Sequence, residues 1–131
     1  MFIRMHRGIV VAAAAVLLTA CATTAQPVYN VSQSPVVASK ARTTDDVGKA
    51  IIRAGVGLGW QMVADRPGHM VGTLKARTHV AVVDIDYNPK FYSIKYRESS
   101  NLNYDGTNIH RNYNSWIQNL DRQIQVQLST L

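Results

Sequence analysis

Asp84 and Asp86 are the two carboxylates whose spacing best fits a catalytic pair. They lie two residues apart in a segment with strand periodicity, so both side chains point to one face. A carboxylic acid and a carboxylate held together can act as general acid and general base. The same face also carries Lys95 and Arg97, a mixture that is typical of a solvated sheet face with cross-strand ion pairs. We therefore expect a structural role for Asp84 and Asp86.

The histidines and the single cysteine form no catalytic motif. The separations of His69, His79 and His110 match no compact zinc motif. Cys21 is the only cysteine, so no intramolecular disulfide can form, and it cannot act as a nucleophile if its sulfur carries a lipid. No serine lies in a Gly-x-Ser-x-Gly turn, and the glycines of residues 55–59 lack the spacing of a phosphate loop. We therefore predict a protein that is not an enzyme and that uses no metal or cofactor.

The densest group of polar residues runs from Glu98 to Asn114. Short amides, hydroxyls and a glycine indicate a loop between a strand and a helix, and such side chains often satisfy the loop's own backbone. The alternative is a recognition site, in which Glu98 and His110 are the titratable members and Tyr104 is an aromatic platform. The candidate ligand- or partner-binding residues are Arg97, Glu98, Asn101, Tyr104 and His110.

Two helices are predicted, one near each end of the domain that carries these residues. Val47, Ile51 and Ala54 recur on one side of a helix expected from about residue 44 to 54, which the following glycines should end. Thr107 or Asn108 is the expected cap of a second helix of about 20 residues. Its apolar stripe comprises Ile109, Tyr113, Trp116, Ile117, Leu120, Ile124 and Leu128.

Four strands with alternating apolar residues should lie between the helices. A turn at residues 88–91 predicts the pairs Tyr87–Tyr92, Ile85–Ile94 and Val83–Tyr96, with Asp84–Lys95 on the other face. The preceding hairpin is expected to pair Met62 with Met70, Trp60 with Gly72, and Leu58 with Leu74. Together these elements predict an α+β fold of order α-β-β-β-β-α, a two-layer sandwich with a four-stranded antiparallel sheet and both helices on one face.

The opposite sheet face is more apolar than a fully solvated face requires. Its apolar members are Val71, Val80, Val82 and Phe91. A partner protein or a second copy of the chain could cover part of it, although scattered exposed apolar residues are also normal.

The N-terminus has the three parts of a secretory signal peptide. Arg4 and Arg7 precede an apolar run over residues 8–18, which is too short to cross a bilayer as a helix. The segment from Leu18 to Cys21 resembles the lipobox of bacterial lipoproteins. That resemblance implies cleavage before Cys21, a diacylglycerol on its sulfur and an acyl chain on the new N-terminus, which together hold a protein stably on a membrane. The alternative is an ordinary signal peptide with a chance cysteine at its end.

The expected organisation is a signal peptide over residues 1–20, a lipidated flexible tether over 21–42 and one domain over 43–131. The tether is expected because its residues are small or polar, include two prolines and show no periodicity. In Gram-negative lipoproteins an aspartate after the cysteine retains the protein at the inner membrane, so Ala22 favours the outer membrane. Removal of the two arginines lowers the net charge from +6 to +4, and an exported domain of this charge is not expected to bind nucleic acid.

Residues 96–104, followed by Ile109-His110, Tyr113-Asn114 and Trp116-Ile117, resemble a group of small proteobacterial lipoproteins. The resemblance spans roughly residues 45–130. It agrees with the expected fold and location, and it implies no catalytic residue.

The leading hypothesis is a lipid-anchored envelope protein that faces the periplasm and acts as a non-enzymatic binding or assembly factor. Its partners would be membrane lipid through Cys21 and an envelope protein, with a second copy on the outer sheet face as a further option. The second hypothesis is a binding module for a cell-wall glycan, a peptidoglycan fragment or a lipid. The third is a small hydrolase, which requires histidine and carboxylate groups gathered in one pocket.

Overall fold

The computed structural model describes residues 24–38, 40 and 42–131. The expected signal peptide and Cys21 therefore lie outside the described residues. Within the described part of the chain, no helix combines the length and the hydropathy needed to span a membrane.

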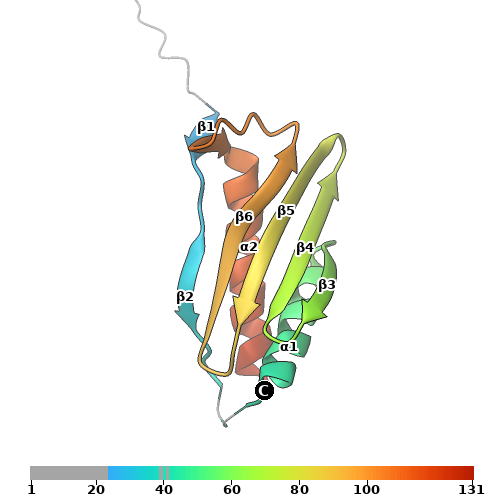
Figure 1. Ribbon diagram of the computed structural model, residues 1–131, viewed down its shortest axis with the longest axis vertical. Helices are drawn as coiled ribbons and strands as arrows, with labels where there is room; N and C mark the ends of the chain where they lie inside the picture. The colour runs from blue at the N-terminus through green and yellow to red at the C-terminus, as the bar shows by residue number, and fades with distance from the viewer. Residues whose placement is uncertain (1–23, 39, 41) are drawn as a thin grey trace, which may run out of the picture.

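One antiparallel sheet of five strands is covered on one face by two helices (Figure 1). The strand order is β2-β6-β5-β4-β3, and a second small sheet pairs β1 with β7. The α+β class is confirmed, but the main sheet has five strands where four were predicted. The strands are β1 Ala25–Pro27, β2 Val31–Pro35, β3 Gln61–Arg66, β4 His69–Ala76, β5 His79–Tyr87, β6 Phe91–Ser100 and β7 Asn108–His110. The helices are α1 Thr44–Gly57 and α2 Arg111–Ser129.

The additional strand comes from the segment for which we expected a flexible tether. Val31 is buried opposite Ile94 of β6, and the backbone N–H of Gln33 donates to the Ser93 hydroxyl over 3.0 Å. β1, from the same segment, pairs with β7 in antiparallel register. A few long-range contacts thus hold a polar, proline-containing segment against the domain, so the folded part begins well before residue 43.

α1 begins as predicted and ends later. Thr43 accepts a hydrogen bond from the Asp46 N–H, and Asp46 accepts one from the Thr43 N–H, which forms a capping box. The helix continues to Gly57, beyond the predicted end at 54, because a helical glycine costs stability without forcing a break. Gly59, with a φ of 87°, makes the turn instead.

The β5–β6 hairpin has the predicted register, including Tyr87 opposite Tyr92 and Asp84 opposite Lys95. The β3–β4 register was wrong by two residues, since Met62 lies opposite Gly72 instead of Met70. A slip of two residues keeps every side chain on its face, so Trp60 still packs beside Gly72. The two faces of the sheet are therefore as predicted even where the pairing is not.

α2 buries most of the predicted apolar stripe against the sheet, although Ile109 lies in β7 and Trp116 is only partly buried. Its N-cap is His110 and not Thr107 or Asn108, because the latter two lie before and within β7. The His110 Nδ1 accepts a hydrogen bond from the Asn112 N–H over 3.2 Å. The core lies between this helix, α1 and the inner face of β4–β6.

Candidate functional site

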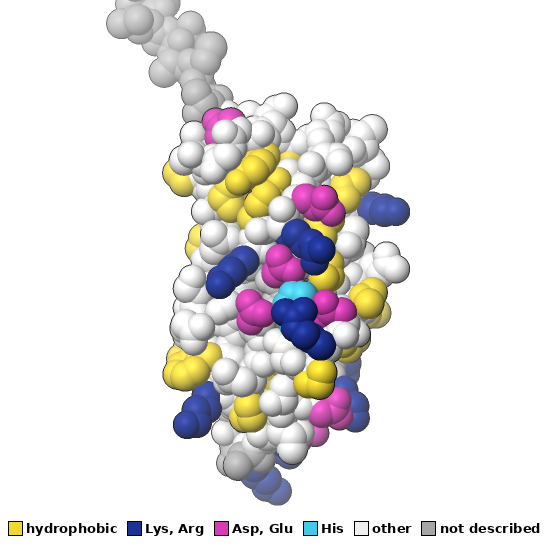
Figure 2. Space-filling view, in the orientation of Figure 1, with side chains coloured by type: hydrophobic (Ala, Val, Ile, Leu, Met, Phe, Trp, Pro, Cys, Tyr) yellow, Lys and Arg dark blue, Asp and Glu magenta, His cyan; other side chains and the backbone are white. Residues whose placement is uncertain are grey.

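The face of the sheet that points away from the helices is called here the outer face. Charged side chains of both signs gather at its centre (Figure 2). Alternation along the strands places on it Val63, Asp65, His69, Val71, Thr73, Val82, Asp84, Asp86, Ser93, Lys95 and Arg97. No helix covers this face in Figure 1.

His69 lies at the centre of the charged group and is only 7% exposed. The sheet register sets it directly opposite Asp86 and diagonal to Asp84. Its Nδ1 lies 2.5 Å from a carboxylate oxygen of Asp65, and its Nε2 lies 2.9 Å from one of Asp84. A doubly protonated imidazole can donate both of these hydrogen bonds, whereas a neutral ring can donate only one.

This geometry raises the pKa of His69 above its ordinary value. The hydrogen bond to Asp65 is the main cause, the bond to Asp84 adds to it, and burial of the ring opposes both. The same contact holds the pKa of the Asp65 carboxyl below its usual range. The two hydrogen bonds therefore favour the charged imidazolium of His69 more strongly than in a free histidine.

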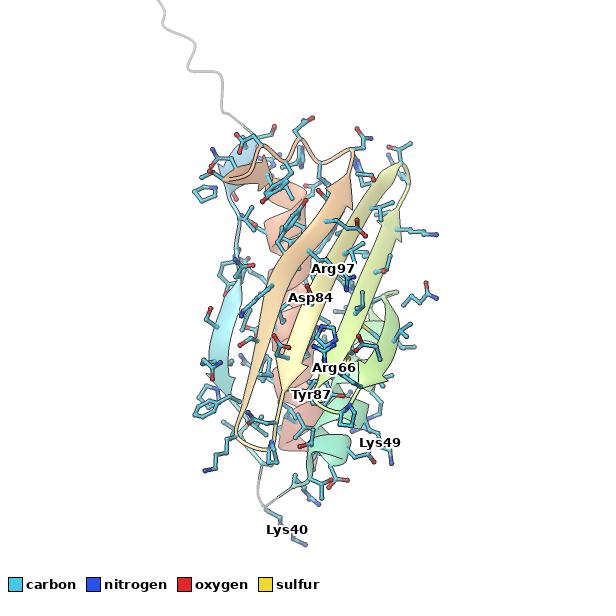
Figure 3. The ribbon with its side chains drawn as sticks, viewed as in Figure 1. Lys40, Lys49, Arg66, Asp84, Tyr87 and Arg97 are labelled. Atoms are coloured by element: carbon cyan, nitrogen blue, oxygen red, sulfur yellow. The ribbon has the colours of Figure 1, made fainter. Side chains whose placement is uncertain are left out.

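Two arginines complete the cluster. The Arg97 Nη1 donates to Asp84 over 3.2 Å, and the Arg66 Nη1 donates to Asp65 over 3.3 Å. Figure 3 shows both arginine side chains on the same part of the face as Asp84. We call Asp65, Arg66, His69, Asp84 and Arg97 the histidine network. It links four strands, β3, β4, β5 and β6, through charged hydrogen bonds.

The network is suited to binding rather than to proton abstraction. Both ring nitrogens of His69 are engaged by carboxylates, so neither is free to take a proton from a substrate. Its charges are fixed in place, which suits recognition of a complementary polar surface. A surface hollow of about 350 Å³ adjoins one end, lined in part by Asp65, Arg66 and Tyr87.

The structure divides the predicted site residues into two groups. Arg97 belongs to the histidine network, and Glu98 lies beside it at a β-bulge, exposed and opposite Val82. The other three lie at the end of the domain where β6 leads to α2. Arg97 and Glu98 therefore lie on β6, while Asn101 and Tyr104 lie in the loop that follows it and His110 lies in β7.

The residues of the second group have partners among their neighbours in the fold. The Asn101 amide donates to the Thr78 hydroxyl over 2.7 Å, and the Asn101 carbonyl lies 2.6 Å from the His79 Nδ1. His110 stacks beside His79 with ring centroids 6.4 Å apart. These contacts agree with the expectation of a loop that satisfies its own hydrogen bonds.

Tyr104 is 42% exposed, but it is not a free aromatic platform. Its ring lies 4.1 Å from that of Tyr96, centroid to centroid, and its hydroxyl donates to the Gly106 carbonyl over 3.4 Å. One face of the ring is therefore occupied by a neighbouring aromatic side chain.

His69 and Asp65 are the site residues that the sequence prediction missed. The sequence does contain a pattern that could have identified them, since strand alternation places His69 on the outer face with Asp84. Their contact, however, depends on the β3–β4 register and on the irregularity between Ala64 and Arg66. The structural role expected for Asp84 agrees with its bonds to His69 and Arg97, although its direct cross-strand neighbour is Lys95.

Among residues 24–38, 40 and 42–131, no three or more His, Cys, Asp or Glu side chains are arranged to hold a metal ion. No protein-family model matches the chain, and no curated protein or solved structure was found to be similar to it. The function must therefore be argued from the fold and from this geometry.

Proposed function

We propose that this protein is a lipid-anchored, non-enzymatic binding factor of the cell envelope that presents its outer sheet face to a partner protein. The observation that carries the proposal is the histidine network, an ordered set of opposite charges on a sheet face that carries no helix. Charges that are already held in place lose little conformational freedom when a partner binds, so they favour specific recognition.

The anchor in this proposal is Cys21, at the end of the lipobox-like segment. Lipid on this residue would hold the domain on the periplasmic side of the outer membrane, which Ala22 favours over the inner membrane. The restriction to a membrane surface raises the local concentration of the domain near other envelope proteins.

A protein partner fits the outer face better than a cell-wall glycan does. Sugars are commonly bound on free aromatic faces, and Tyr104, the expected platform, is stacked on Tyr96. The outer face instead combines fixed charges with the half-exposed Val63, whose side chain adds apolar area beside Asp65. Mixed polar and apolar surface of this kind is typical of non-obligate protein interfaces.

Photo-crosslinking in intact cells tests this proposal. A photoreactive amino acid at Thr73 or at Lys95 places the probe on the outer face, and the same residue at the exposed Gln118 of α2 is the matched control. We expect a discrete crosslinked protein from the first two positions and none from Gln118. Equal crosslinking from both faces, or products with cell-wall material alone, would contradict the proposed partner.

Alanine substitution of single arginines provides a second version of the crosslinking experiment. Arg97→Ala removes one cation of the network, while Arg122→Ala removes an exposed cation from α2. Loss of one charged contact at an interface commonly costs about 1–3 kcal/mol, so the Arg97 variant should reduce the crosslink yield several-fold. An unchanged yield would exclude Arg97 from the interface.

A further inference from the structure

We propose that one end of the domain lies directly on the phospholipid surface, with the outer sheet face standing upright above the membrane. This anchor end consists of residues 24–29, 77–79 and 101–111. The inference rests on the proposed lipid attachment at Cys21, and it adds a second interaction surface whose partner is the head-group layer.

The first observation is where the described chain begins. Thr24 is already docked, because its carbonyl accepts a hydrogen bond from the Arg111 N–H over 2.8 Å. The next three residues form β1 and pair with β7. Only three peptide steps separate Thr24 from Cys21, and they span about 10 Å even when fully extended.

The second observation is a set of hydrogen bonds that join Asn114 and Thr107 to residues 27–29, called here the clamp. It holds these residues against the domain, so they cannot lengthen the tether. Asn114 is buried, and its amide oxygen accepts from the Tyr29 N–H over 2.9 Å. Its amide nitrogen donates to the Pro27 carbonyl over 2.9 Å. The Val28 N–H donates to the Thr107 carbonyl over 3.0 Å. The tether is therefore short for as long as this clamp is closed.

The length of the segment between Cys21 and Thr24 determines how the domain is oriented on the membrane. The hydrocarbon core of a bilayer is about 30 Å thick and the whole bilayer about 40–45 Å, so one head-group layer occupies about 5–8 Å. A span of about 10 Å barely clears that layer. A domain that floats free above the membrane would need a longer tether, so the anchor end must rest on the head groups.

The opposite end of the domain is far from the membrane in this orientation. The strand β6 runs from the β5–β6 turn to the anchor end and has 10 residues, which corresponds to about 33 Å at about 3.3 Å per residue. Figure 1 places the β5–β6 turn and the C-terminus at the end away from β1. The strands then stand steeply on the membrane, and the histidine network stays open to the periplasm.

The side chains of the anchor end suit a phospholipid surface. Arg77 and Arg111 are exposed, and a guanidinium binds phosphate with two parallel hydrogen bonds. Tyr29 and Tyr104 are 37% and 42% exposed, and a tyrosine combines an apolar ring with a polar tip. The carboxylate of Asp105 lies at the same end and accepts hydrogen bonds from the Thr107 and Asn108 N–H groups, but the two guanidinium groups leave this end with a net charge of +1.

Site-specific labelling of the full lipidated chain tests the orientation. Because the lipid would occupy the only native cysteine, a single new cysteine can be labelled cleanly. Thr107→Cys places a fluorophore at the anchor end, and Lys90→Cys places it in the β5–β6 turn as the control. Each protein is reconstituted into vesicles of phosphatidylethanolamine and phosphatidylglycerol that carry a head-group quencher.

The expected result is a large loss of fluorescence from the Thr107 label and almost none from the Lys90 label. Equal quenching at both positions, or no quenching at either, overturns the proposed orientation. The mass of the N-terminal peptide is measured on the same samples, so an unlipidated Cys21 counts against the proposed anchor, whereas a lipidated chain without end-selective quenching counts against the orientation alone.

Substitution of Asn114 in the clamp provides a second test of the proposed orientation. In the Thr107→Cys background, Asn114→Ala should release β1, lengthen the tether and reduce the quenching, while Asn112→Ala at an exposed position of the same helix should not. Circular dichroism confirms that both variants are folded. Full quenching in a folded Asn114→Ala protein would overturn the role assigned to the clamp.

Discussion

At the scale of single residues, His69 makes stability depend on pH in a defined direction. Its pKa is raised in the folded protein above the ordinary value of 6.5, so its contribution is complete below that pH and is lost as the pH rises through the folded-state pKa. The pKa of Asp65 is lowered below 3.8, so the contribution of this carboxyl is present above that pH and lost in stronger acid. The network therefore stabilises the fold most between about pH 4 and pH 6.5.

His69→Gln is the variant that tests this assignment. Glutamine keeps polar atoms in the same place but cannot become charged. We expect the wild type to have a higher free energy of unfolding at about pH 6 than at about pH 9, and we expect the variant to lose much of that difference. Chemical denaturation at both pH values measures it. An identical pH dependence in the two proteins would show that His69 is not the group responsible.

Two buried tyrosines should respond in opposite ways to loss of the hydroxyl. The Tyr92 hydroxyl donates to Asp121 over 2.6 Å, and burial together with this bond raises the pKa of Tyr92 to about 12. Tyr113 is buried as well, and no described residue offers its hydroxyl a hydrogen bond. Burial raises the pKa of Tyr113, because an uncompensated buried hydroxyl is costly to ionise.

We therefore expect Tyr92→Phe to lower the free energy of unfolding by about 1.5 kcal/mol. Tyr113→Phe should leave it unchanged or raise it by up to about 1 kcal/mol, because it removes an unsatisfied polar group. Urea denaturation of the two matched variants measures both changes in the free energy of unfolding. A larger loss from Tyr113→Phe than from Tyr92→Phe would contradict the hydrogen-bond assignment.

At the scale of the elements, the sequence predicted the parts whose patterns are local. The β5–β6 hairpin was predictable because one turn fixes its register and a slip of one residue would invert both faces. The β3–β4 register was not, because alternation cannot distinguish a slip of two residues from the true pairing. β2 was missed since its evidence lies in long-range partners, such as Ile94 for Val31, and not in its own composition.

The glycines of α1 give an element-scale prediction. A methyl group added at Gly48 would lie 2.8 Å from the buried Tyr87 ring, whereas one added at Gly57 meets nothing within 4 Å. Gly48→Ala should therefore lower the free energy of unfolding by about 1 kcal/mol through overpacking. Gly57→Ala should raise it by about 0.5 kcal/mol, because alanine has the higher helix propensity. Thermal unfolding of both variants is the measurement, and a stabilising Gly48→Ala would mean that Tyr87 can move aside.

At the scale of the whole molecule, the sequence predicted which face of the sheet is open but not how its charges are joined. Asp84 and Arg97 were placed together on that face by alternation alone. The histidine network also needs Asp65 and His69, which meet across a hairpin whose register was wrong. The remaining candidates, Asn101, Tyr104 and His110, lie at the end of the domain where β6 leads to α2, so one continuous polar stretch of sequence contributes to two separate parts of the molecule.

The central claim of a lipid-anchored domain depends on one atom, the sulfur of Cys21. The most direct measurement is the mass of the N-terminal peptide from protein purified out of membranes. The account predicts a peptide that begins at Cys21 and is heavier by a diacylglycerol and an acyl chain. A peptide that begins at any other residue, or a Cys21 with a free thiol, would contradict the anchor and the membrane orientation that rests on it.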